Sequence, residues 1–136
     1  MKRSEARDLA FTLVFEKAFR EDSMEDIIAD AAEARLIEED DFALSLARSV
    51  GEHLEEIDAL ISHYSDKWKI GRLPRVTLSV LRLALCELRY FDDIPYAATI
   101  NEAVELAKKY STQDDAAYAN GVLGAYVKDL AAAAEK

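Results

Sequence analysis

The chain has 136 residues, a length that suits a single domain with a buried core. Two prolines and four glycines leave little room for the turns of an all-β fold and favour an all-helical one. Acidic side chains outnumber basic ones by 27 to 17, a formal charge of −10. Most of the surface therefore repels a phosphate backbone, and any contact with nucleic acid must be local or assisted by a partner.

Targeting and redox signals are few. The single cysteine excludes an internal disulfide and a multi-cysteine zinc site, which suits a reducing compartment. No apolar run approaches the roughly 20 residues of a membrane span, and the first residues lack a signal-peptide core. We expect a cytoplasmic protein that does not associate with membranes.

The first helix is predicted from Ser4 to Arg20, where apolar residues repeat with helical period. Lys2, Arg3 and Arg7 crowd its amino end, where cations oppose the helix dipole. Two interpretations stay open: these are solvated terminal charges, or they form a small phosphate-facing patch.

Two further helices are predicted before the middle of the chain. A capping box at residues 23–26 opens a short helix to about residue 34. A long helix follows from about Asp40 to Tyr64 and carries His53 and His63. The two histidines are ten residues apart and lack a metal-ligand pattern, so we expect them at the edge of the core and predict no metal site.

Residues 65–73 form the one plausible internal joint. They divide a single domain, 1–136, into an amino-terminal half of about 1–65 and a carboxy-terminal half of about 66–136. Trp68 is predicted to seal the seam between these halves.

The central helix, Arg75 to Tyr90, is apolar almost all round and must be buried by neighbours on most sides. Its polar residues share one face, which predicts a stripe touched by water or a ligand: Arg75, Ser79, Arg82, Cys86 and Arg89. Glu87 lies on an apolar face and needs hydrogen-bond partners, for which the backbone amides of residues 92–95 are natural. No second carboxylate, nucleophile or metal ligand accompanies it, so a structural role is favoured over a catalytic one.

The last two helices are predicted from Pro95 to Tyr110 and from about Ala116 to Ala132. Gly121 and Gly124 interrupt the second of these, where glycine costs about 1 kcal/mol relative to alanine. With two alanines they form a smooth face that predicts the close approach of another helix. No phosphate loop, nucleophile triad or metal spacing occurs anywhere, so we expect a non-enzymatic protein without a cofactor.

Several short segments together keep the order and spacing of a known family over nearly the whole chain. They are Ala6–Asp8 and Phe15, Trp68 with Arg72–Leu73, Val80–Ala84, Glu87–Leu88, Asp93–Pro95, Ile100–Lys108 and Asn120–Leu123. This set resembles the NusB family of transcription antitermination factors. The resemblance implies an all-α fold of about seven helices in two small packed bundles.

The resemblance also implies a function. NusB-like proteins pair with NusE, a small-subunit ribosomal protein, and the pair binds the single-stranded boxA sequence of nascent RNA. With other Nus factors the complex lets RNA polymerase resist termination, notably on ribosomal RNA operons.

Site residues follow from the same resemblance. The RNA-binding candidates are Lys2, Arg3, Arg7, Phe15, Asp114 and Tyr118, with Arg82 as a weaker one. The candidates for contact with the protein partner are Arg75, Arg89, Asp93 and Glu102. The basic motif is thinner than in many relatives, because Glu5 and Asp8 are interleaved with it.

Two alternatives remain open. The first is a protein-binding scaffold or homodimer with lost or weak RNA binding. The second is a domain associated with a ribosomal RNA cytosine methyltransferase. The second ranks last, because the chain leaves no room for that catalytic domain.

Overall fold

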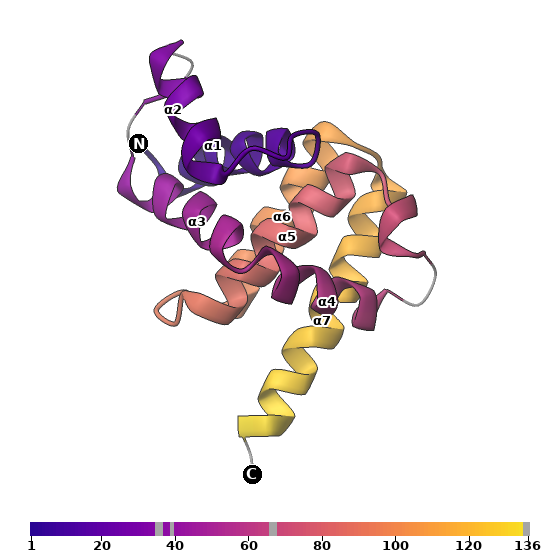
Figure 1. Ribbon diagram of the computed structural model, residues 1–136. Coiled ribbons are helices and arrows are strands. Elements are labelled where there is room, and N and C mark those ends of the chain that lie inside the picture. Colours follow the sequence, from indigo (N-terminus) through magenta and orange to yellow (C-terminus); the bar gives the residue numbers. More distant parts are fainter. Residues whose placement is uncertain (35–36, 39, 66–67, 135–136) are drawn as a thin grey trace.

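The computed structural model describes residues 1–34, 37–38, 40–65 and 68–134. Within these ranges seven α-helices and one short 3-10 turn follow one another, and no strand occurs. The elements are α1 (Arg3–Lys17), α2 (Met24–Glu33), α3 (Asp41–Glu52), α4 (Leu54–Tyr64), η1 (Ile70–Arg72), α5 (Arg75–Tyr90), α6 (Tyr96–Tyr110) and α7 (Gln113–Ala134). The all-helical prediction is confirmed (Figure 1).

Helix α5 is the element against which the others pack. It contacts α1, α3, α4, α6 and α7, and every residue from Thr77 to Leu88 is buried. Helices α1, α2 and α3 contact one another, as do α6 and α7. The division into two halves at residue 65 stays a prediction, and α4, which precedes it, already packs against α5 and α7. The end of α7 extends beyond the other helices (Figure 1).

The polar stripe of α5 faces other helices, so the prediction that water or a ligand touches it is wrong for its middle part. The Arg82 guanidinium donates two hydrogen bonds of 2.9 Å to the Asp58 carboxylate on α4. The Cys86 thiol donates to the Ser49 hydroxyl on α3 at 3.0 Å. Polar groups on α3 and α4 satisfy this face, which allows it to be buried.

Glu87 is buried as its position on an apolar face indicated, but its partner differs from the prediction. Both carboxylate oxygens accept hydrogen bonds of 3.0 Å from Nε of Arg7 on α1, and Nη2 of Arg7 donates to the same group. The exposed fractions are 5% for Arg7 and 2% for Glu87. The hydrogen-bond partner of Glu87 is therefore a charged side chain 80 residues away in sequence, in place of the backbone amides predicted from residues 92–95.

The long helix predicted from residue 40 to residue 64 is broken at His53. This residue has φ −112° and ψ 21°, and it ends α3 and precedes α4. Its Nδ1 lies 2.9 Å from the Ser49 carbonyl oxygen, and its ring stacks on Tyr90 with centroids 4.0 Å apart. His53 is half-buried, as predicted, whereas His63 is exposed.

Two packing predictions are wrong. Trp68 is 51% exposed and does not seal a seam. The smooth face of α7 is open, because an added Cβ at Gly121 or Gly124 meets no atom within 4 Å. Both glycines therefore lower the stability of the helix relative to alanine, and no other helix among the described residues packs closely against them.

None of the described helices has both the length and the apolar character needed to cross a membrane.

The glycine environments predict opposite effects for two substitutions. Gly121→Ala should raise the free energy of unfolding by up to about 1 kcal/mol. Alanine is favoured over glycine at a position in the middle of a helix, and the added methyl group has room at residue 121. Gly51→Ala should lower it, because the new Cβ would lie 2.7 Å from Cβ of Met24. Urea unfolding of both variants checks this, and equal shifts would contradict the packing described.

Candidate nucleic-acid interface

The amino end of α1 carries two exposed cations. Lys2 is the N-cap residue of the helix and makes no side-chain cap hydrogen bond, and Arg3 follows it. The Arg3 guanidinium lies 3.9 Å from the centroid of the Phe42 ring on α3. Both side chains are thus presented on the surface, with Arg3 held in place by a cation–π contact.

Arg7 is not part of this exposed group. Its guanidinium forms an ion pair with Glu87 in the core, so it is not accessible to a phosphate. This placement corrects the expectation that Arg7 contacts RNA directly: it positions α1 against α5. Arg82 is corrected in the same way, because it is 9% exposed and engaged with Asp58.

A row of aromatic rings begins on the carboxy-terminal half of α1 and ends at Phe19, two residues beyond the helix; Phe11 is buried and Phe15 half-buried. We call this row the aromatic surface. Phe11, Phe15 and Phe19 recur every four residues and contact one another in turn, with ring centroids 5.9 Å and 5.0 Å apart. Tyr110 at the end of α6 stacks on Phe11 at 4.9 Å. Phe19 is 63% exposed, and the Arg75 guanidinium lies 5.9 Å from its ring centroid. Exposed rings beside a cation are the groups on which bases of a single strand stack.

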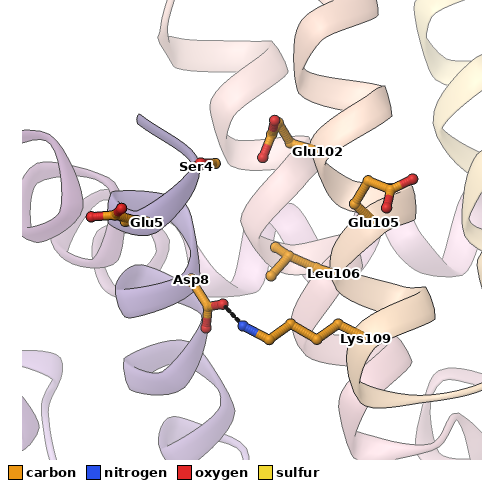
Figure 2. Close-up of a pocket in the computed structure, with 7 residues that line it drawn as sticks. All are labelled: Ser4, Glu5, Asp8, Glu102, Glu105, Leu106 and Lys109. Carbon is orange, nitrogen blue, oxygen red and sulfur yellow. Dashed lines mark hydrogen bonds and ion pairs between the residues drawn. The ribbon is translucent and has the colours of Figure 1, made fainter. Parts of the chain in front are cut away.

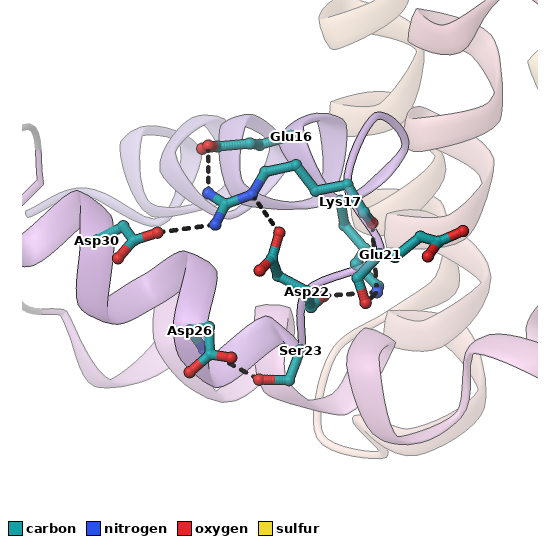
Figure 3. Close-up of polar contacts among 8 residues, drawn as sticks. Glu16, Lys17, Glu21, Asp22, Ser23, Asp26 and Asp30 are labelled. Carbon is teal, nitrogen blue, oxygen red and sulfur yellow. Dashed lines mark hydrogen bonds and ion pairs between the residues drawn. The ribbon is translucent and has the colours of Figure 1, made fainter.

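Other cations near this surface are held by the protein itself. The Arg20 guanidinium bonds to Glu16, Asp22 and Asp30, and Lys17 donates to three backbone carbonyls (Figure 3). The hydrogen bond from Arg20 holds the pKa of Asp22 below its usual value. This network joins the end of α1 to α2 and leaves little free positive charge there.

A groove between α1 and α6 is acidic. It is lined by Ser4, Glu5, Asp8, Glu102, Glu105, Leu106 and Lys109 (Figure 2). Lys109 pairs with Asp8, which also accepts a hydrogen bond of 2.5 Å from the Tyr110 hydroxyl. The hydrogen bonds that Tyr110 and Lys109 donate to Asp8 raise the pKa of both donors. With four carboxylates against one lysine, the groove repels phosphates.

The start of α7 brings two predicted residues together. Asp114 is exposed in the first turn, where its charge suits the helix dipole. Tyr118 lies one turn further along, and its hydroxyl bonds to that of Ser65. Asp114 and Tyr118 line a pocket together with Trp68, which precedes α5 in the chain.

The four predicted partner contacts do not form one surface. Arg75 and Arg89 stand near opposite ends of α5, and Glu102 lies in the acidic groove. Arg89 is bonded to Glu56 and to the Tyr126 hydroxyl, and Asp93 lies in the exposed turn before α6. Arg75 instead adjoins Phe19, which places it with the RNA candidates.

Sequence reasoning missed three exposed aromatic residues near these candidates: Phe19, Trp68 and Tyr110. The spacing of Phe19 from Phe15 was a usable signal, since residues four apart share a helix face. No local pattern indicated that Tyr110 would reach α1. Within the described residues, no group of three potential metal ligands occurs.

This combination defines a small all-helical protein whose candidate site offers positive charge and stacking surfaces. The sequence model of the NusB family matches residues 4–128. Two curated relatives, each called transcription antitermination protein NusB, are 42% identical (Natranaerobius thermophilus) and 39% identical (Acetivibrio thermocellus). The alignments cover 96% of this chain and 97% of the first relative, and 94% and 90% for the second. The chain belongs to the NusB family.

Solved structures agree with this assignment. A T. maritima NusB has a TM-score of 0.82 at 36% identity, covering 94% of this chain and 92% of its own. A chain in a solved complex of the antitermination factors NusB and NusE with double-stranded RNA has a TM-score of 0.82 at 29% identity. The match covers 93% of this chain and 96% of that one. The family consists of non-enzymatic factors, which confirms that prediction.

The buried ion pair predicts a large loss of stability when one partner is removed. Arg7→Met and Glu87→Met should each lower the free energy of unfolding by about 3–5 kcal/mol, because each leaves an unpaired buried charge. The matched control is Arg48→Met, which breaks the exposed pair with Glu25 and should cost less than about 1 kcal/mol. Equal losses in urea unfolding would contradict the burial of the first pair.

Proposed function

We propose that this protein is an RNA-binding transcription antitermination factor that acts with NusE. The observation that carries the proposal is the exposed charge and aromatic surface of α1, in a chain of the NusB family. A relative of similar fold is known in complex with NusE and RNA, and it supports the same pairing here.

Phosphates would be bound at Lys2 and Arg3, which are exposed at the amino end of α1. Bases of a single strand would stack along Phe15, Phe19 and Tyr118, with Arg75 beside Phe19. The strand would avoid the acidic groove between α1 and α6. Because the surface is otherwise acidic, a partner that supplies positive charge would strengthen the binding.

The finer assignment follows the family resemblance. The RNA would be a boxA-type sequence in a nascent transcript, and the protein would act in the cytoplasm on ribosomal RNA operons. Other Nus factors and RNA polymerase would complete the complex.

The contact with NusE fits the end of the molecule where α5 leads into α6. Asp92 and Asp93 are exposed there, and the adjoining side chains of Tyr90 and Tyr96 are 37% and 42% exposed. Tyrosine is enriched in protein interfaces, and the exposed carboxylates would attract a partner that carries positive charge. The carboxylates of the acidic groove, including Glu102, offer a second attraction of the same sign.

RNA binding should depend on the exposed cations of α1. The double variant Lys2→Glu/Arg3→Glu should weaken binding of the protein–NusE pair to single-stranded RNA and flatten its dependence on salt, because fewer counterions are released. The control is Lys128→Glu, an exposed lysine on the distal part of α7. Fluorescence anisotropy of labelled RNA at several salt concentrations measures both.

A pair that holds together but ignores RNA would support the scaffold alternative instead. Equal weakening by the Lys128 control would show a general charge effect rather than a binding surface.

A further inference from the structure

The ring of Phe42 contacts side chains from the start of α1 and from the end of α5. Phe42 is the second residue of α3 and is half-buried. It makes an edge-to-face contact with the ring of Phe91, the residue that ends α5, at a centroid distance of 5.6 Å and an angle of 74°. Phe42 thus joins three helices at one point, and a second ring fixes its orientation on one side.

Two guanidinium groups of α1 approach the same ring. The Arg3 guanidinium lies 3.9 Å from the ring centroid, and that of Arg7 lies at 5.5 Å. A cation this close to an aromatic face is attracted by the ring quadrupole. Arg7 directs its donors at Glu87, so its place is fixed without the ring. Arg3 has no side-chain hydrogen bond or ion pair among the described residues, and the ring is therefore the contact that holds it.

The contact with the ring leaves the Arg3 guanidinium open to a ligand. A guanidinium carries its N–H donors around its edge, in the plane of the group, and a ring beneath its central carbon does not occupy them. Arg3 is also exposed to solvent. Its donors can therefore bind a phosphate with two parallel hydrogen bonds.

The ring also keeps Arg3 apart from nearby carboxylates. Asp40 caps α3 by accepting a hydrogen bond of 2.9 Å from the backbone N–H of Ala43, and Asp41 is exposed beside Phe42. Neither carboxylate pairs with Arg3 in the part of the chain described. An uncharged ring can hold a cation without neutralising it, whereas a carboxylate would compete with the phosphate for the same donors.

We propose that Phe42 is a positioning residue for RNA binding. Its ring holds the Arg3 guanidinium in the orientation in which Arg3 binds a phosphate of single-stranded RNA, and Phe42 itself does not touch the RNA. An arginine side chain loses rotamer freedom when it binds, and a guanidinium already held by the ring loses less. The proposal rests on the proposed RNA-binding function and deepens it, because it gives α3 a part in a contact made by α1.

The test uses the full chain with NusE, and fluorescence anisotropy of labelled single-stranded RNA measures the affinity. Phe42→Leu keeps an apolar side chain at the edge of the core but removes the aromatic face. It should weaken RNA binding about two- to fivefold, which corresponds to the strength of an exposed cation–π contact. Phe42→Tyr, which restores the face, should recover most of the loss.

A double-mutant cycle with Arg3→Lys separates positioning from packing. Arg3→Lys keeps the charge but loses the planar fork of donors, so alone it should weaken binding by a similar factor. If the ring acts through the guanidinium, Phe42→Leu/Arg3→Lys should bind as weakly as either single variant and no weaker. Losses that multiply would show that Phe42 acts independently of Arg3 and would overturn the proposal.

Leu44→Ala is the matched control for packing. Leu44 is half-buried on α3 and lies two residues from Phe42, so it is on a different face of the helix. This variant should lower the unfolding midpoint in urea yet leave the affinity for RNA unchanged. An equal loss of affinity in Leu44→Ala would assign the effect to the stability of α3 and overturn the positioning role.

The outcomes separate this proposal from the proposed function. Unchanged RNA affinity in Phe42→Leu would overturn the positioning role of the ring and leave the proposed function intact. Failure of the wild-type pair to bind RNA would overturn both.

Discussion

The buried pair of Arg7 and Glu87 is the constraint on which the rest of the structure depends. Two charges taken out of water must stay together, because either one alone would carry its full desolvation cost. Arg7 comes from α1 and Glu87 from the middle of α5, so the pair fixes one helix against the other. The exposed cations and the aromatic surface lie on the same α1. Their position therefore depends on an interaction that contacts no ligand.

Helix α5 uses the same principle along its polar face. Arg82 binds Asp58 on α4, and Cys86 bonds Ser49 on α3, where burial raises the pKa of the thiol to about 11. Basic side chains such as Arg7 and Arg82 thus form ion pairs that join one helix to another. A chain of net charge −10 therefore has few cations left for the RNA contact proposed above; they include Lys2 and Arg3 at the start of α1. The candidate RNA surface is local for the same reason.

Helical periodicity predicted most of the fold, because apolar spacing reports which residues leave water. The ends of α1, α2, α5 and α6 fall within a few residues of the predicted ones. The break at His53 was missed, since the apolar stripe continues on both sides of it. The polar stripe of α5 was misread for a related reason: spacing shows that residues share a face, but the partner of that face lies far away in sequence.

The same limit applies to the candidate site. Lys2, Arg3 and Asp114 are exposed, as a binding role requires. Arg7 lies within the same basic motif, yet its carboxylate partner is 80 residues away and no local pattern reveals it. The pocket that Trp68 and Tyr118 line lies beside a contact between Ser65 and Tyr118, which are 53 residues apart in sequence, and spacing does not show this contact either.

The central claim is that Arg7 positions α1 and does not bind RNA. The double variant Arg7→Met/Glu87→Met tests it, because it removes both charges at once and leaves no unpaired one in the core. We predict that this variant folds and, with NusE, binds single-stranded RNA with the affinity and salt dependence of the unmodified protein. A folded variant that loses affinity and salt dependence would contradict the account and return Arg7 to the RNA interface.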